Sequence, residues 1–141
     1  MGKFVHVIAA RPNFIKAAPL IKVLANKGST NVIIHTNQHY DFMLSQVFFQ
    51  DLNIPEPDYH LGIRSGTHGS QTGRSLIEIE KILIKENPEA VLIYGDVNSS
   101  LAGALAASKL NIPIHHIEAG CRSGDKTMPE EVNRVLIDHC S

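Results

Sequence analysis

The sequence has little of what marks secreted, membrane-spanning or nucleic-acid-binding proteins. It holds only two cysteines, Cys121 and Cys140, which indicate neither a disulfide framework nor a C-x-x-C motif. No apolar stretch approaches the roughly 20 residues that a membrane helix needs. The apolar run near the N-terminus stops at Arg11, too early for a signal peptide. Thirteen Lys and Arg against 14 Asp and Glu give a net charge of −1, whereas nucleic-acid binders normally carry a basic excess. We therefore expect a cytoplasmic protein that binds neither membranes nor nucleic acid.

What is present is a chain that can fill a core. Its 141 residues, 43% of them hydrophobic, match the usual size of one globular domain. A chain of this length buries roughly 70% of its unfolded surface on folding, so it needs no disulfide or structural metal. We expect a single domain over residues 1–141.

Short apolar, β-branched segments alternate with longer helical patterns along the chain. This alternation predicts βαβ units, parallel strand pairing and a three-layer, Rossmann-like α/β fold. Pro19 is expected to kink or divide the first helix. The last helix has no C-cap and no following strand, which suggests the front part of a longer or a truncated architecture. Strands are predicted at 4–9, 32–36, 90–94 and 114–117, with a weaker one at 59–63, and helices at 13–27, 42–51, 70–86, 99–109 and from 129 onward.

Polar residues follow the predicted strands. In an open parallel sheet, ligands bind at the carboxyl ends of the strands. A cation at a helix N-terminus together with carboxylates able to act as acid or base suits a phosphorylated small molecule that undergoes proton transfer. These residues are Arg11 and Lys16 after the first strand, Asp96 after the strand at 90–94, Glu118 at the end of the last strand, and Glu130 and Glu131 where the last helix begins.

Four of these residues also have a simpler explanation. Arg11 could be a partner in a surface salt bridge, and Asp96 could be a charge placed favourably at a helix N-terminus. Glu130 and Glu131 fit the same favourable interaction with the helix dipole.

Several familiar sites are absent. The first strand is followed by Ala-Ala-Arg-Pro and no G-x-G-x-x-G, so ordinary dinucleotide binding is not expected. No phosphate-binding Walker A loop and no G-x-S-x-G nucleophile elbow occur. His115 and His116 are adjacent and must point to opposite faces of a strand, so they cannot bind one metal ion. We expect no cofactor and no metal.

Four segments in this order carry a resemblance. They read RPNFIK at 11–16, TNQHYD at 36–41, YGDVNS at 94–99, and IEAGCRS at 117–123 followed by MPEEVNR at 128–134. Together they resemble the non-hydrolysing UDP-N-acetylglucosamine 2-epimerase family over essentially the whole chain. The resemblance implies a GT-B architecture, in which two Rossmann-like domains enclose the active site and this chain is the first domain.

The resemblance also implies an activity. Members interconvert UDP-N-acetylglucosamine and UDP-N-acetylmannosamine by anti elimination of UDP to a 2-acetamidoglucal and re-addition of UDP, with no nicotinamide cofactor or required metal. They usually pair through the first domain, so a homodimer is expected. The implied roles are acid/base catalysis for Asp96, Glu118 and Glu130, substrate binding for Arg11, Lys16, Glu131 and Arg134, and an allosteric second-substrate site for Gln38, His39 and Gln71.

Two other functions stay open at this stage. The first is that of the hydrolysing relatives, which release UDP and free N-acetylmannosamine. The second is a non-catalytic binding domain of the flavodoxin-like type. Because much of the UDP-binding surface should lie in a second domain, we expect the isolated chain to turn over little substrate.

Overall fold

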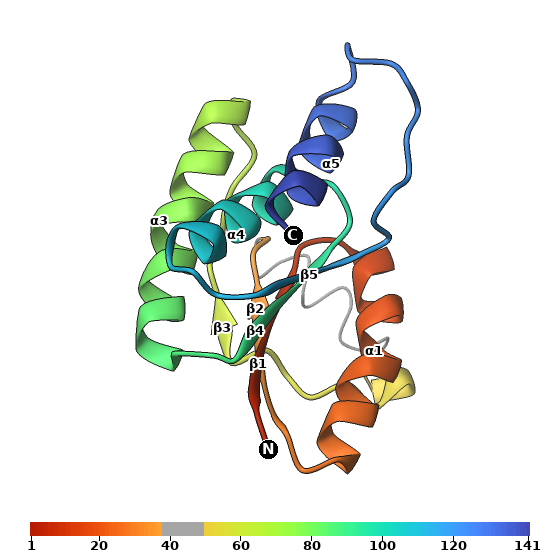
Figure 1. Ribbon diagram of the computed structural model, residues 1–141, viewed down its shortest axis with the longest axis vertical. Coiled ribbons are helices and arrows are strands. Elements are labelled where there is room, and N and C mark those ends of the chain that lie inside the picture. The colour runs from red at the N-terminus through yellow and green to blue at the C-terminus, as the bar shows by residue number, and fades with distance from the viewer. Residues whose placement is uncertain (38–49) are drawn as a thin grey trace.

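Apolar strands form a five-stranded parallel sheet in the computed structural model, which describes residues 1–37 and 50–141 (Figure 1). The strand order is β3-β2-β1-β4-β5. All four neighbouring pairs are parallel, as predicted for a chain whose strands alternate with helices. The strands are β1 (Lys3–Ile8), β2 (Thr30–His35), β3 (Tyr59–His60), β4 (Ala90–Tyr94) and β5 (Ile114–Ile117).

Helices cover both faces of this sheet. One layer contains α1, and the opposite layer contains α3, α4 and α5 (Figure 1). The result is the three-layer Rossmann-like arrangement that the sequence predicts. The helices are α1 (Arg11–Asn26), α3 (His68–Glu86), α4 (Asn98–Lys109) and α5 (Pro129–Cys140).

The alternation of side chains along the strands explains why both faces are apolar. In β4, Val91 and Ile93 pack in the core beneath α3 and α4, whereas Leu92 and Tyr94 pack against the α1 side. A strand that is buried on both sides is therefore apolar along most of its length. The helix α4 lies so close to the sheet at Gly103 that a side chain does not fit there. A Cβ atom at this position would stand 2.8 Å from Ile93 Cδ1.

Two expectations differ from the observed elements, and a third cannot be compared with them. The helix α1 is not divided at Pro19, which lies with Ile15 on its exposed side. Water can therefore bind the Ile15 carbonyl that loses its amide partner. The strand β3 ends at His60 because its partner β2 ends opposite it at His35. The helix predicted at 42–51 lies largely outside the described residues.

A buried polar triad crosses the middle of the sheet. The His6 ring, fully buried, lies 2.9 Å from Tyr94 Oη through Nδ1 and 2.8 Å from Asn31 Oδ1 through Nε2. Since an amide oxygen only accepts, Nε2 carries the proton and Nδ1 accepts from the Tyr94 hydroxyl. Burial lowers the pKa of His6, and the hydrogen bond to Asn31 opposes this effect only in part.

The strand order places a crevice between β1 and β4. The chain leaves β1 toward one edge of the sheet and β4 toward the other, so their carboxyl ends form the topological switch point of the sheet. The loops with the predicted site residues lie at this end.

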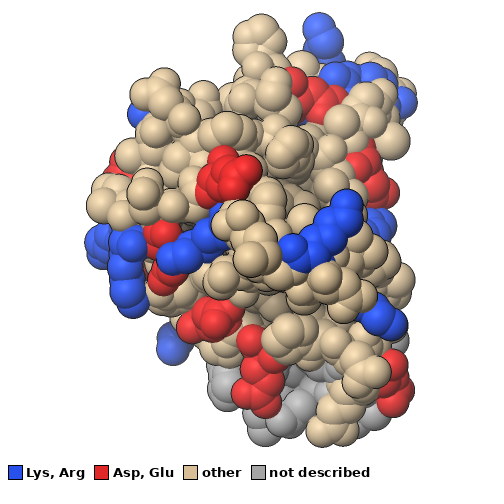
Figure 2. All heavy atoms as spheres, turned by 60° about the horizontal axis from the view of Figure 1, so that its bottom comes forward, with Lys and Arg blue, Asp and Glu red and all other residues tan. Residues whose placement is uncertain are grey.

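Figure 2 shows the face that the bottom of Figure 1 presents when it is turned forward, and on this face basic and acidic side chains are interspersed. None of the helices within 1–37 and 50–141 combines the length and apolarity that crossing a bilayer requires.

Candidate active site

Asp96 stands on a sharp turn at the end of β4. The turn begins at Gly95, whose φ of 74° is in the left-handed region and where a Cβ atom would lie 3.0 Å from Asn13 Oδ1. The helix that follows is capped by Val97 without a side-chain hydrogen bond, so Asp96 is not its cap. Its carboxylate instead accepts from Arg134 of α5, with Oδ2 at 2.6 Å from Nη2 and 3.2 Å from Nε.

Glu118 stands directly after β5. Its φ of 76° is a left-handed conformation that side chains other than glycine rarely adopt. The half-exposed carboxylate forms an ion pair with Lys16 in the second turn of α1. Two charged residues that are 102 positions apart in the sequence are therefore neighbours at the carboxyl edge of the sheet.

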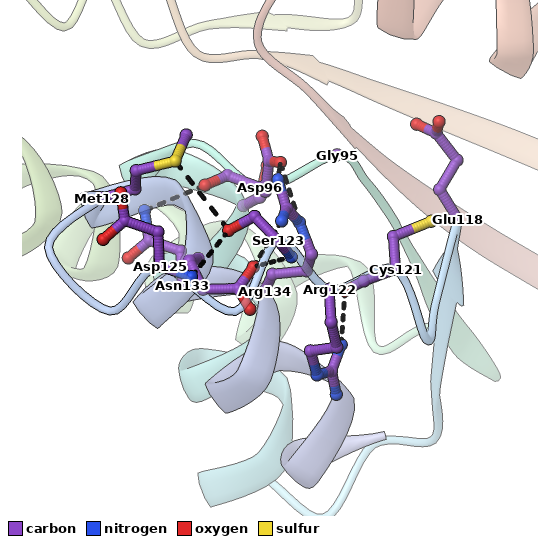
Figure 3. A network of polar contacts seen from close by, with 12 residues as sticks. Gly95, Asp96, Glu118, Cys121, Arg122, Ser123, Asp125, Met128, Asn133 and Arg134 are labelled. Atoms are coloured by element: carbon purple, nitrogen blue, oxygen red, sulfur yellow. Dashed lines mark hydrogen bonds and ion pairs between the residues drawn. The ribbon is translucent and has the colours of Figure 1, made fainter.

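Asp96 and Glu118 share one small cavity of about 110 Å³ (Figure 3). In the close-up, Asp96 is directed at Arg134, and Glu118 stands apart at the end of β5. Acidic residues that follow two different strands thus line one space. The cavity is lined by Gly95, Asp96, His116, Glu118, Cys121 and Arg134.

Arg11 and Glu130 do not line this cavity. Arg11 is the first residue of α1 and is exposed. Glu130 lies exposed in the first turn of α5. It precedes Arg134 by four positions and is therefore on the same side of that helix.

Glu131 serves the protein's own backbone. Its side chain is buried, and its oxygens accept the amide hydrogens of Ser123 at 3.0 Å and Gly124 at 3.1 Å. The same carboxylate forms an ion pair with Arg134. The Ser123 amide contributes most to holding the pKa of Glu131 below its usual value, against the effect of burial. Glu131 therefore shapes the loop before α5 and holds the guanidinium that binds Asp96.

A chain of amides extends from Asp96 toward a second cavity. Asn133 Nδ2 donates to the Asp96 carbonyl at 2.9 Å and to Asn98 Oδ1 at 3.1 Å. Asn98 Nδ2 donates in turn to Gln71 Oε1 at 2.9 Å. Gln71 lines a cavity of about 190 Å³ at the switch point, between residues 9–10 and 97–99. The other two predicted allosteric residues, Gln38 and His39, lie outside the described residues.

His116 has contacts that the sequence patterns did not predict. Its buried ring lies with Nε2 at 2.9 Å from the Gly95 carbonyl, and Nδ1 contacts Asp138 of α5. Asp138 also accepts from the Gly120 amide at 2.9 Å and from Arg122 at 2.7 Å. Burial raises the pKa of Asp138, but the Gly120 amide, Arg122 and His116 outweigh it and lower the value to about 2. One signal was available, because one of two adjacent strand histidines must face inward.

No group of three or more His, Cys, Asp or Glu side chains is placed to hold a metal ion within the described ranges. Two kinds of polar contact surround the cavity, as Figure 3 shows: ion pairs between side chains, such as Arg134 with Asp96, and hydrogen bonds from backbone amides to side chains, such as Ser123 to Glu131. The arrangement places the cations Lys16 and Arg134 beside Glu118 and Asp96, and it offers these carboxylates for proton transfer.

Comparisons with known proteins identify the family. A family model described as UDP-N-acetylglucosamine 2-epimerase matches residues 22–141. A "UDP-N-acetylglucosamine 2-epimerase homolog" of Methanococcus maripaludis is 58% identical over 139 residues, which are 99% of this chain and 39% of that protein. The UDP-2,3-diacetamido-2,3-dideoxy-D-glucuronate 2-epimerase of Pseudomonas aeruginosa is 54% identical over 99% of this chain and 40% of its own length.

A solved structure agrees with the sequence comparisons. The UDP-GlcNAc 2-epimerase of Methanocaldococcus jannaschii, in complex with UDP-GlcNAc and UDP, superposes with a TM-score of 0.92 and 54% identity. The match covers 99% of this chain and 38% of that one, so this chain spans about two fifths of the length of such relatives. On these grounds the chain belongs to the UDP-N-acetylglucosamine 2-epimerase family.

Proposed function

We propose that this chain forms the N-terminal, Rossmann-like half of a two-domain GT-B isomerase that interconverts UDP-N-acetylglucosamine and UDP-N-acetylmannosamine. The observation that carries the proposal is the shared cavity of Asp96 and Glu118 at the carboxyl edge of the sheet. The M. jannaschii relative, whose structure contains UDP-GlcNAc and UDP, matches nearly the whole of this chain.

The proposed reaction explains why several carboxylates are needed. A base removes the hydrogen at C2, the electrons of that bond form the C1=C2 double bond, and the C1–O bond to the diphosphate breaks. The resulting glycal then accepts a proton at C2 from the opposite face while a UDP oxygen re-forms the bond to C1. A hydrogen on carbon is a poor acid, so both steps need positioned acid or base groups on the two faces of the ring.

We assign the proton transfers to Asp96, Glu118 and Glu130 as a set. Lys16 beside Glu118 and Arg134 beside Asp96 support them with positive charge close to where the negative diphosphate departs. We propose that Arg11 joins these cations and that Glu131 acts on substrate binding through Arg134, to which its carboxylate is bound.

A second substrate is favoured by one observation. The P. aeruginosa relative named for UDP-2,3-diacetamido-2,3-dideoxy-D-glucuronate is 54% identical to this chain, similar to the 55% of the M. jannaschii UDP-N-acetylglucosamine enzyme. The two sugars share the acetamido group at C2 where the chemistry takes place. They differ in the second acetamido group and the carboxylate, so parallel assays with both substrates decide between them.

We further propose that the protein acts as a homodimer in the cytoplasm without a cofactor or metal. Gln71, with Gln38 and His39, is proposed as part of a site for a second nucleotide sugar. Gln71 lines the 190 Å³ cavity, which is connected to Asp96 through Asn98 and Asn133.

The test is a chimera in which this chain replaces the matching part of the M. jannaschii enzyme, because the isolated chain is expected to turn over little. NMR follows conversion of UDP-N-acetylglucosamine and uptake of deuterium at C2. Asp96→Asn and Glu118→Gln should each lower turnover by about 100-fold or more. The matched control is Glu80→Gln, an exposed carboxylate on α3 that should change nothing.

Two other outcomes would redirect the assignment. Release of free N-acetylmannosamine in place of the nucleotide-linked epimer would indicate the hydrolysing reaction. Full turnover in both carboxylate variants would contradict a catalytic role for this cavity and favour a binding domain.

A further inference from the structure

The loops of Asp96 and Glu118 are connected through a buried side chain that touches neither carboxylate. His116 precedes Glu118 by two positions on β5, and its side chain is 1% exposed. From there Nε2 reaches the carbonyl of Gly95, the residue before Asp96. One ring therefore joins the end of β5 to the turn at the end of β4.

The other nitrogen of the same ring faces α5. Nδ1 contacts Asp138, whose second oxygen accepts the amide of Gly120, two residues after Glu118. Oxygen atoms thus lie opposite both ring nitrogens, and both are placed to donate. Asp138 is held ionised by its surroundings, because the contacts to Gly120, Arg122 and His116 outweigh the effect of burial on its pKa.

The backbone at Glu118 needs such support. Gly95 and Glu118 have φ values of 74° and 76°, in the left-handed region. For Glu118 this conformation is strained, and strain of this kind persists only where surrounding contacts maintain it. His116 lies two residues before Glu118, and the amide of Gly120 that binds Asp138 lies two residues after it.

We propose that His116 and Asp138 are positioning residues that fix Asp96 and Glu118 relative to each other across their shared cavity. The consequence for catalysis rests on the proposed epimerase function, whereas the consequence for loop order does not. Misplacing a catalytic group by about 1 Å can cost on the order of 100-fold in rate, so a fixed separation is worth maintaining.

The two contacts can be removed one at a time. An asparagine amide nitrogen takes the place of Nδ1, so His116→Asn keeps a donor toward Asp138 and loses the Gly95 carbonyl. A glutamine amide nitrogen takes the place of Nε2, so His116→Gln keeps the Gly95 contact and loses Asp138. His115→Asn, on the exposed side of the same strand, is the matched control.

Amide hydrogen exchange on the 141-residue chain is the first measurement. In His116→Asn we expect exchange over residues 95–98 to rise about tenfold, and in His116→Gln the same rise over residues 118–123. The amides of the core strand β1 should exchange at the rate of the unsubstituted chain in both His116 variants. All amides of the control His115→Asn should do the same. Rates within twofold of the parent in both loops of both variants would overturn the positioning role.

Turnover in the chimera is the second measurement. We expect kcat of His116→Asn to fall by about 10- to 100-fold with KM within about threefold, and a smaller loss in His116→Gln. Unchanged kcat despite faster exchange would overturn the catalytic consequence. If the parent chimera shows no epimerisation, the proposed function fails, while the exchange rates still decide whether the pair orders the loops.

Discussion

The turn before Asp96 allows a prediction about the stability of the backbone that positions this carboxylate. Gly95→Ala adds a Cβ atom at a residue with φ of 74°, at 3.0 Å from Asn13 Oδ1. Asn13 is itself buried and donates from Nδ2 to the Tyr94 carbonyl at 3.3 Å. The methyl group therefore meets both backbone strain and a side chain that has little room to move.

The size of the effect follows from three opposing contributions. A left-handed alanine costs roughly 1–2 kcal/mol, and disturbing the Asn13 hydrogen bond costs about 1 kcal/mol. The reduced freedom of the unfolded chain returns roughly 0.4–1 kcal/mol. The net loss is about 1–2.6 kcal/mol. A domain of 141 residues loses roughly 3–4 °C of Tm per kcal/mol, so Tm should fall by roughly 3–9 °C.

Thermal unfolding followed by circular dichroism measures this change, with Gly73→Ala as the control. Gly73 lies inside α3 and nothing stands within 4 Å of its added Cβ, so alanine there should stabilise the helix by about 1 kcal/mol. The two substitutions are chemically identical and should shift Tm in opposite directions. A Gly95→Ala protein that melts at or above the parent temperature would refute the reasoning.

Two further predictions concern titration and the ion pair at the cavity. Burial holds the pKa of His6 below its ordinary value of 6.5, so the unfolded state binds more protons as the pH falls through 6.5. The contribution of His6 to stability is complete above that pH and is lost below it, by at most about 1.4 kcal/mol per pH unit. Urea unfolding from pH 7.5 to 5.5 should therefore show a flatter pH dependence in His6→Gln, and equal slopes would contradict this. Lys16→Met removes the half-exposed partner of Glu118, so it should cost less than about 1 kcal/mol in stability. Turnover of the chimera should nevertheless fall at least about tenfold, and the reverse pattern, a large loss of Tm with full activity, would indicate a structural ion pair.

The order of elements could be predicted from the sequence because local patterns encode it. Apolar runs of strand length between helical patterns give the parallel sheet, and the rule that ligands bind at carboxyl ends brings Asp96 and Glu118 to one edge. The extent of β3 could not be predicted, because it depends on where its partner strand ends, at His35. The four sequence motifs by themselves also indicate the family.

The residue types at the ends of the strands and the buried segments can be read from the order of amino acids, since side-chain periodicity reports burial directly. Tertiary structure alone decided which of them meet. The contacts of Arg134 with Asp96 and of Asp138 with His116 join residues 38 and 22 positions apart. They depend on where the segment after β5 places α5 and on how that helix is rotated about its axis. The pattern of buried residues in the sequence does not specify this rotation. For the same reason Glu131, adjacent to Glu130, faces its own backbone while its neighbour faces solvent.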